Sequence, residues 1–439
     1  MSDLWSPGQK YNRMIASDDD LKLAEVLHRF VDEKVMPKRR DLEGGPSRDR
    51  ELAEATFHEL ITGLVQLDIQ RAFFPEEIGG LGLTSRVTGC IICEEIARGD
   101  IGLATAMTII PWAFTPAFLT NNQTVLEKFA RPFCGDKHLM ACLSMTEPPG
   151  GCNIEDGVQK GRTIQTTAKL EGDEWVINGQ KLWPSGAGIS EVYATVCTTD
   201  PLAGEDGIAI IYVPKDAEGL TFGEPEEKMG LLYTDVNSAI YYDDVRVPKE
   251  FCCGEPGGEG ARMLRHIANA RLEDAALSAG AAQAVLEIVM EYTGGRYILG
   301  KPVREHSLHA AILGEMAGKI QIARSSYMDI ASMYDQPELY GETNSDAQLA
   351  RASAIKNFAT QTAIEVMHTS MELMGSYGYS PEYLVEKYLR DVLILRLWLG
   401  GVQLGNLDIA RGHYPYNPWE RYGQPTLDEA GHSELNLLA

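Results

Sequence analysis

Apolar residues recur every three to four positions from Asp18 to about Lys137, which is the spacing of helices that bury one face. The first such segment, "DDDLKLAEVLHRFVDEKVMPKRR", begins with acids, and acids are stabilised at the N-terminal end of a helix dipole. The pattern predicts further helices at about 50–68, 84–98, 102–120 and 124–134. A loop with Pro and Gly at its ends, "PEEIGGLGL", covers residues 75–83.

The period shortens to two from about residue 139 to 250, in runs such as "EWVINGQKLWPSG" and "GIAIIYVPK" that Gly, Asn and Asp separate. Beyond residue 258 the helical period returns in three long segments and two shorter ones, at about 381–395 and 398–411. We therefore predict an α+β protein. Its parts are an N-terminal helical domain (1–138), a small antiparallel middle β domain (139–257), a C-terminal helical bundle of the four-helix type (258–411) and a C-terminal extension (412–439).

Charge and apolar content narrow the classes of function. The 439 residues carry a net charge of −24, which repels nucleic acid and anionic membranes. No apolar run is expected to reach the roughly 20 residues of a membrane-spanning helix, and "MSDLWSPGQKYNRM" lacks the apolar segment of a secretory signal. We expect a cytoplasmic protein that binds neither nucleic acid nor a membrane.

Eight cysteines are scattered along the chain without a partnering His cluster, so we expect no metal site. Cys90 and Cys93 form a CxxC inside a predicted helix, where a redox or zinc site would want a turn, and we interpret them as buried thiols. Cys252 and Cys253 are adjacent, and a disulfide between neighbours would be strained.

Five motifs, in this order, make the chain resemble the acyl-CoA dehydrogenase superfamily over nearly its whole length. They are "PEEIGGLG", "LSMTEPPGGCN" (143–153), "INGQKLWPSG" (177–186), "GRYILGKPVREH" (295–306) and "GSYGYSPEYLVEKYLRD" (375–391). The resemblance implies FAD as the cofactor, an acyl-CoA thioester as the substrate and an electron-transfer flavoprotein or similar acceptor. It also implies a homotetramer, a dimer of dimers, or a heteromer with a paralogue.

The resemblance places the flavin ring between two of these motifs. Met145 and Thr146 would supply hydrogen-bond donors to the ring edge, because polar ring atoms buried without partners are costly. Trp183 would pack on the ring, and Ser185, which replaces the family's usual Thr, would bond near its N5 atom.

Further cofactor-binding positions implied by the resemblance are Gly151, Cys152, Arg296, Glu372, Gly375 and Gln403. Gly151 permits a close backbone approach to the pyrophosphate, while Cys152 stands where the family often has Ser. Arg296 matches an arginine that reaches the flavin pyrophosphate of a neighbouring subunit. Glu372 stands where the family commonly has Gln, and its charge would repel the phosphates unless it is protonated or turned away.

The segment "RDVLILRLWLGGVQLGN", which begins at Arg390, lacks the acid that the resemblance leads us to expect. Ordinary family members remove the α-proton of the substrate with a Glu, and aligning this segment places Leu399 at that position. Some members place the base just before the arginine that Arg271 matches, but here that residue is Ala270. Neither side chain can accept a proton.

Two acids near the expected pocket are candidates for a relocated base, Asp100 and Glu273. For Asp100 we favour the role of N-cap of the helix at 102–120, and Glu273 could equally be a surface or paired acid. The positions that the resemblance assigns to substrate binding are Arg271, Ala104, Thr105, Thr108 and Leu399.

The small residues of this pocket favour a bulky acyl group. Ala104, Leu399 and the glycines at 400 and 401 predict a roomy, apolar pocket, so we expect oxidation of a bulky or alicyclic acyl-CoA to an unsaturated one. Two alternatives stay open. One is flavin-assisted elimination or reduction, such as desulfination or decarboxylation, and the other is a non-catalytic subunit of a heteromeric dehydrogenase.

Overall fold

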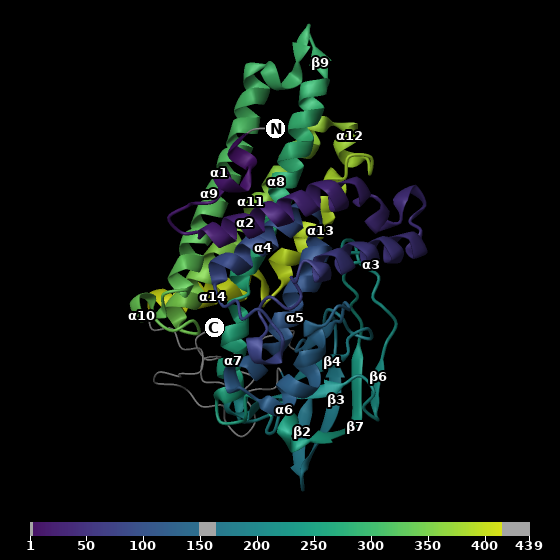
Figure 1. The fold of residues 1–439 in the computed structure, drawn as a ribbon, viewed down its shortest axis with the longest axis vertical. Helices are drawn as coiled ribbons and strands as arrows, with labels where there is room; N and C mark the ends of the chain where they lie inside the picture. The colour runs from purple at the N-terminus through teal and green to yellow at the C-terminus, as the bar shows by residue number, and fades with distance from the viewer. Residues whose placement is uncertain (1–2, 149–163, 415–439) are drawn as a thin grey trace, which may run out of the picture.

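The computed structural model describes residues 3–148 and 164–414, in three regions that follow one another along the chain (Figure 1). The first region is helical, with α1 (Pro7–Lys10), α2 (Asp18–Phe30), α3 (Arg50–Gln66), α4 (Arg86–Gly99), α5 (Ile101–Thr120) and α6 (Gln123–Val125). Side-chain caps begin several of these helices. Ser17 accepts a hydrogen bond from the Asp20 amide and Ser85 from the Thr88 amide, which satisfies donors that the first turn leaves open.

The middle region is a sheet made of β1 (Ala141–Ser144), β2 (Thr167–Glu171), β3 (Glu174–Lys181), β4 (Val192–Thr198), β5 (Ile208–Pro214), β6 (Leu220–Phe222), β7 (Ile240–Pro248) and β8 (Cys252–Cys253). The strands pair in the order β6-β7-β3-β2-β4-β5-β8, and β1 pairs with β4. The prediction of an antiparallel sheet needs one correction, because β1 runs parallel to β4 and β2 meets β4 in parallel at one position. Parallel neighbours require a long crossover, and the chain between β1 and β4 provides it.

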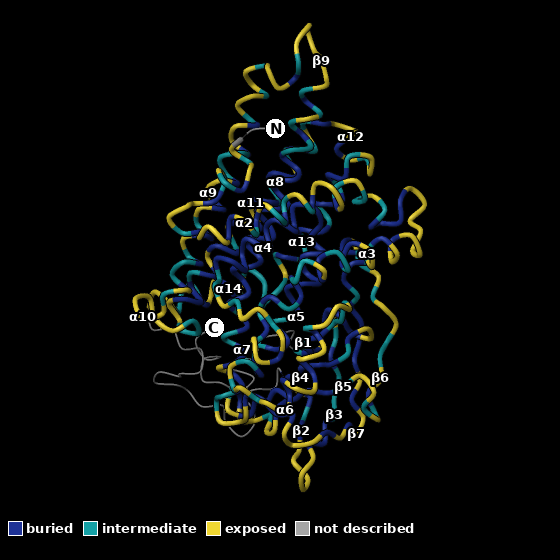
Figure 2. Tube along the Cα trace, viewed as in Figure 1, coloured by how far each residue is buried: buried dark blue, intermediate teal, exposed yellow. Residues whose placement is uncertain are grey.

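The third region is a helical bundle with α7 (Glu259–Ala268), α8 (Arg271–Gly295), α9 (Ser307–Tyr334), α10 (Pro337–Tyr340), α11 (Asp346–Met374), α12 (Ser376–Tyr379), α13 (Val385–Leu397) and α14 (Gly401–His413). The short strands β9 (Tyr297–Ile298) and β10 (Lys301–Pro302) close the tip between α8 and α9, which projects away from the sheet (Figure 1). α11 packs against α8, α9, α13 and α14, and α4 packs against α8. The first and third regions therefore share one buried core (Figure 2).

The α+β class with this order of regions agrees with the prediction, whereas the exact domain limits stay predictions. Almost all of the expected C-terminal extension lies outside the described residues.

α5 overturns one expectation, because this helix is long and apolar enough to cross a membrane by length and composition alone. The protein itself surrounds it, and 83% of its most apolar window is buried. The Tyr212 hydroxyl of β5 donates to the Ala113 carbonyl at 2.7 Å, which ties α5 to the sheet. A helix that is apolar on all sides is explained here by its place in the core.

Cys90 and Cys93 are buried free thiols inside α4, as predicted. Burial raises the pKa of both thiols, so they stay protonated and unreactive near neutral pH. Cys252 and Cys253 are free as well.

Candidate active site

The turn at residues 398–401, between α13 and α14, has a strained backbone. Leu399 has φ 51°, Gly400 φ 90° and Gly401 φ 69°, so three residues in a row lie in the left-handed region. A Cβ on Gly400 would meet the Leu404 side chain at 2.1 Å. Leu399 has no such freedom, and the left-handed conformation costs a side chain about 1–2 kcal/mol. Such strain persists only where neighbouring contacts enforce it.

Two cations from different helices hold this turn by its carbonyl groups. Arg271 of α8 donates to the Leu399 carbonyl from Nε at 3.2 Å and from Nη2 at 2.9 Å. Lys356 of α11 donates to the Trp398 carbonyl. The Trp398 ring meets the edge of the Trp112 ring at 6.5 Å between centroids. The position expected to carry the base thus holds a half-buried leucine in a firmly held turn.

Arg271 is buried and contacts residues of α11 and α14 as well as the turn. Besides the Leu399 carbonyl, it donates to Ser353 Oγ at 2.8 Å and pairs with Asp408. The structure shows that Arg271 positions the turn, and direct substrate binding by Arg271 stays a prediction.

A small apolar cavity of about 20 Å³ lies beside this region, between α4, α5 and the N-terminal end of α8. Ala104, Thr108 and Glu273 all line it, so the structure brings these three predicted residues together. Thr105 is buried beside them but does not line the cavity, and its hydroxyl donates to the Ile101 carbonyl at 2.8 Å. Leu399 is not part of the cavity wall either.

Glu273 has partners on two helices. Trp112 Nε1 donates to its carboxylate at 2.5 Å, and Arg86 lies 3.4 Å away. Burial raises the pKa of Glu273, and the Arg86 charge opposes this rise. Glu273 is thus a paired acid on the cavity wall.

Asp100 is completely buried and both its carboxylate oxygens have partners. The Leu103 amide donates to Oδ1 at 3.0 Å, so the predicted N-cap is confirmed. Lys387 of α13 donates to Oδ2 at 2.5 Å. The cap and the ion pair together fasten the start of α5 to the C-terminal bundle. A role as the base stays a prediction.

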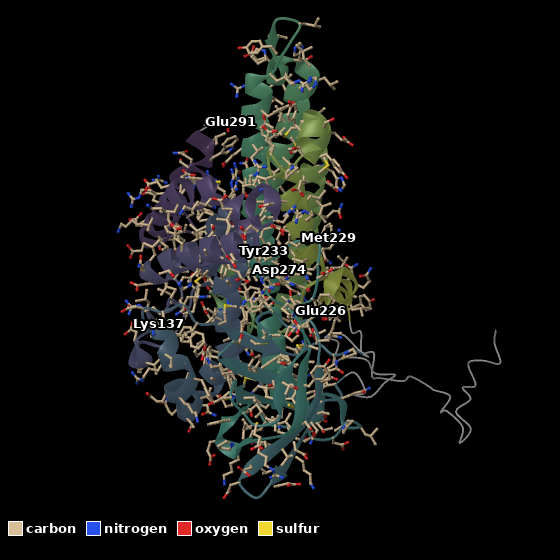
Figure 3. All side chains as sticks on the ribbon, turned by 90° about the vertical axis from the view of Figure 1, so that its right-hand side faces the viewer. Lys137, Glu226, Met229, Tyr233, Asp274 and Glu291 are labelled. Atoms are coloured by element: carbon tan, nitrogen blue, oxygen red, sulfur yellow. The ribbon has the colours of Figure 1, made fainter. Side chains whose placement is uncertain are left out.

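Sequence reasoning missed Asp274, a fully buried acid of α8 that Figure 3 labels near the middle of the molecule. Among the described residues, no donor lies within hydrogen-bonding distance of either oxygen, and the Lys356 ammonium is 3.7 Å away. Burial raises the pKa of Asp274, while Lys356 lowers it. The available signal was the pair of adjacent acids in "RLEDAALSAG", because two acids in such an apolar helix cannot both face solvent.

The segment at Met145 and Thr146 is fastened by a buried lysine. Lys181 donates to the Met145 carbonyl at 3.0 Å and to Glu147 at 2.7 Å. The Leu182 amide donates to the Thr146 carbonyl at 2.9 Å, which sets Thr146 beside the loop that carries Trp183.

Trp183 offers a flat apolar surface next to hydroxyl groups. It has φ 69°, and 46% of the residue is exposed. Asn237 donates to the Trp183 carbonyl at 2.9 Å and lies 3.4 Å from the Ser185 hydroxyl. A half-exposed Trp183 with the Ser185 hydroxyl nearby, and with Thr146 on the adjoining segment, fits a flavin ring, which needs a flat wall and hydrogen bonds at its edges.

The residues predicted to serve the pyrophosphate lie elsewhere. Arg296 is exposed at the end of α8, where it contacts Tyr292. Tyr292 in turn reaches the Met374 carbonyl at 3.4 Å, so Arg296 lies on the same side of the bundle as Glu372 and Gly375. Glu372, Gly375 and Gln403 are exposed, while Gly151 and Cys152 lie outside the described residues. Arg296 is thus exposed within this single chain, and its contact with the cofactor of a neighbouring subunit stays a prediction.

Two relatives resemble the chain over most of its length. It is 26% identical to cyclohexane-1-carbonyl-CoA dehydrogenase of Syntrophus aciditrophicus, over 90% of this chain and 96% of that protein. It is 28% identical to benzylmalonyl-CoA dehydrogenase of Aromatoleum aromaticum, over 90% of this chain and 98% of that protein. The structure of butyryl-CoA dehydrogenase from Megasphaera elsdenii superposes with a TM-score of 0.78 at 25% identity, covering 92% of this chain and 99% of the other.

Three family models match consecutive parts of the chain. The N-terminal domain of acyl-CoA dehydrogenase matches residues 17–129, its middle domain 142–245 and its C-terminal domain 258–413. The chain therefore belongs to the acyl-CoA dehydrogenase family of FAD-dependent flavoprotein oxidoreductases that oxidise acyl-CoA thioesters.

Proposed function

We propose that this enzyme oxidises a bulky or alicyclic acyl-CoA thioester to an unsaturated acyl-CoA, with a proton acceptor that is not residue 399. The observation that carries the proposal is the turn at 398–401. Its carbonyls are held by Arg271 and Lys356, but the side chain at its centre is Leu399, which cannot accept a proton.

The chemistry of the thioester determines what the cofactor and the protein side chains must each provide. FAD, when bound, would supply an acceptor for the hydride of the acyl group's β-carbon. The chain must then polarise the thioester carbonyl, exclude water and provide a carboxylate for the α-proton. Met145 and Thr146 are proposed to hold the ring edge, with Trp183 against its face and Ser185 near N5. Arg296, Glu372, Gly375 and Gln403, together with Gly151 and Cys152, stay proposed contacts of the cofactor.

The acyl pocket is proposed to lie against α4, α5 and α8, where the cavity of about 20 Å³ has to widen when a ring-shaped acyl group enters. Ala104 and Thr108 are short, and the Thr108 hydroxyl donates to the Ala104 carbonyl at 2.5 Å, so it presents no free donor to a ligand. A ring-shaped or branched acyl group suits such an apolar wall. The names of the two relatives, which denote a cyclohexane and a benzylmalonyl thioester, support this choice.

Asp100 and Glu273 differ as candidate bases. Asp100 caps α5 and pairs with Lys387, so both its oxygens are engaged. Glu273 lines the cavity, which favours it over Asp100, although Trp112 and Arg86 engage its carboxylate.

The test uses purified holoenzyme with oxidised flavin, mixed anaerobically with acyl-CoA thioesters while the flavin absorbance is followed. We expect cyclohexane-1-carbonyl-CoA to bleach the flavin at least tenfold faster than butyryl-CoA. Bleaching that favours butyryl-CoA contradicts the bulky substrate class. The variants Asp100→Asn and Glu273→Gln then test the two sequence candidates, because an amide of the same shape cannot take the proton.

An acyl-CoA substrate and an electron-transfer flavoprotein partner are typical of the family. For this chain we propose a cytoplasmic homotetramer, in which Arg296 of one subunit completes the cofactor site of another. Leu399 and the acid Glu372 favour one second candidate, a non-catalytic subunit of a heteromer. Protein that purifies without flavin, and that no thioester bleaches after loading with FAD, would favour that candidate.

A further inference from the structure

We propose that Asp274 is the group that accepts the α-proton of the substrate. This inference deepens the proposed function and rests on it, because it names the carboxylate that a dehydrogenase with Leu399 at the usual position requires.

The placement of Asp274 relative to the turn carries the inference. On a helix, side chains tilt toward the N-terminus, so Asp274 lies over the preceding turn of α8, which contains Ala270 and Arg271. Arg271 holds the Leu399 carbonyl. Lys356, 3.7 Å from Asp274, holds the Trp398 carbonyl. Both cations that grip the turn are thus neighbours of Asp274, and a single ammonium group bridges its carboxylate to the turn.

The second argument is that Asp274 accepts no hydrogen bond within the part of the chain that the structure describes, and its ion-pair partner, the Lys356 ammonium, is 3.7 Å away. Neither oxygen accepts a hydrogen bond from a described residue, although the side chain is completely buried. A buried carboxylate without donors is costly, and such groups are rare where nothing but stability is at stake. Asp100 and Glu273 both have close donors. Of these three acids, Asp274 is the one whose oxygens accept no hydrogen bond from the described residues, although Glu273, and not Asp274, lines the cavity.

The surroundings of Asp274 also suit a base that works near neutral pH. The charged or titratable groups that face it are Lys356 on α11, Arg271 and Glu273 on α8, and Cys93 on α4. Burial raises the pKa of Asp274 to about 7, with Glu273 adding to the rise and the two cations opposing it. A carboxylate with such a pKa is a stronger base than an exposed one and is still largely ionised at slightly alkaline pH.

The proposed step is balanced as follows. The bond between the α-carbon and its hydrogen breaks, and the proton goes to a carboxylate oxygen of Asp274. The electron pair of that bond forms the double bond between the α- and β-carbons, as the β-hydrogen leaves with its own pair to the bound flavin. The acyl-CoA is oxidised by two electrons and the flavin is reduced by two.

The test compares wild type with Asp274→Asn, Asp274→Glu, Glu273→Gln and the control Glu287→Gln. Glu287 is another acid of α8, but it pairs with Arg98, far from the turn. Flavin bleaching by cyclohexane-1-carbonyl-CoA is followed by stopped flow from pH 5 to 9. Exchange of the substrate's α-hydrogen in deuterated water is followed by mass spectrometry. Thermal unfolding of each variant shows whether it is folded.

We expect Asp274→Asn to bind thioester while losing at least about 100-fold in bleaching rate, the lower range for removal of a general base. It should also lose the α-exchange. The wild-type rate should rise with pH through about 7. Asp274→Glu should recover part of the rate with a changed pH profile, which a merely structural role would not produce.

Other outcomes overturn the inference. If a folded Asp274→Asn enzyme bleaches and exchanges at the wild-type rate, the inference fails while the proposed function stands. The same holds if Glu273→Gln loses all bleaching while Asp274→Asn keeps normal rates. If Asp274→Asn does not fold, the comparison uses Asp274→Glu. The inference fails if this variant folds but shows no flavin bleaching, while Glu287→Gln bleaches at the normal rate. A wild type that no thioester bleaches overturns the proposed function instead, and the inference with it.

Discussion

The protein buries two groups of aspartate and lysine, and the difference between them is instructive. In the first, Lys387 lies between Asp100 and Asp391, 2.5 Å from each. Every one of these acids has a second partner, because the Leu103 amide donates to Asp100 at 3.0 Å and the Leu231 amide to Asp391 at 2.8 Å.

In the second group, Asp274 and Lys356 are 3.7 Å apart, and Lys356 donates a hydrogen bond to the Trp398 carbonyl. Asp274 receives no hydrogen bond from the described residues. A buried acid whose oxygens all have donors contributes to the stability of the fold, which is enough to explain its presence. A buried acid that is left without donors, beside a strained turn, is better explained by chemistry.

The largest effect is expected when the first group loses its lysine. Lys387→Met leaves two buried acids without their common cation, so the free energy of unfolding should fall by roughly 3–5 kcal/mol. Urea denaturation followed by circular dichroism measures this loss. Lys22→Met is the control, because Lys22 contacts Asp19 on the surface. A Lys387→Met protein as stable as wild type would show that the first group is not structural.

The second prediction concerns the stability of wild type against pH. Burial holds the pKa of Asp274 near 7, above the roughly 3.9 of an unfolded chain, so between these values the folded state binds a proton that the unfolded state lacks. The contribution of Asp274 to the free energy of unfolding, measured as the difference between wild type and Asp274→Asn, should therefore fall as pH rises from about 4 to about 7. Asp274→Asn removes this fall and should exceed wild type at pH 8 by roughly 2–4 kcal/mol. Urea denaturation measures this difference, and the prediction is contradicted if wild type and Asp274→Asn differ in free energy of unfolding by the same amount at pH 5 and pH 8.

The third prediction concerns Lys356, the lysine of the second group, when it is replaced by Met as Lys387 was in the first. Lys356→Met removes the cation nearest to Asp274, and the pKa of this carboxyl should rise further. The pH at which flavin bleaching reaches half its maximum should move up by at least about one pH unit. Stopped-flow bleaching between pH 6 and 10 measures the change. An unmoved midpoint would separate Lys356 from the titrating group.

The smallest effect is expected at Glu273, which lies between the two extremes because it has one close donor and one distant cation. Trp112→Phe removes the indole donor, so the free energy of unfolding should fall by about 1 kcal/mol. Chemical denaturation measures it, with Trp175→Phe as a comparison because Trp175 Nε1 is buried without a partner among the described residues. Equal losses in both variants would mean that the hydrogen bond contributes little.

Much of the fold was accessible from periodicity, because each region repeats one spacing over many residues. The predicted helices at 50–68, 84–98 and 102–120 correspond to α3, α4 and α5 within a few residues. The N-cap at Asp100 was also predictable, since it depends on local sequence only. The parallel pairing of β1 with β4 was not, because strand order depends on a long connection.

The site was less accessible, because its contacts join distant segments. Asp100 meets Lys387 across 287 positions, and Arg271 meets Leu399 across 128. No spacing rule links such pairs. Leu399 was found because a motif marks its position, whereas the sequence marks Asp274 only as one of two adjacent acids in an apolar helix, and its missing donors are visible only in the structure.

The bond between Asp100 and Lys387 has a consequence for synthesis on the ribosome. Helix α5 begins about a quarter of the way along the chain, yet the lysine that neutralises its first residue is translated near the end. The nascent N-terminal helices must wait for α13 before their charge is balanced. We therefore expect final closure of the core late in synthesis, and a chain truncated before α13 would keep the buried Asp100 without its cation.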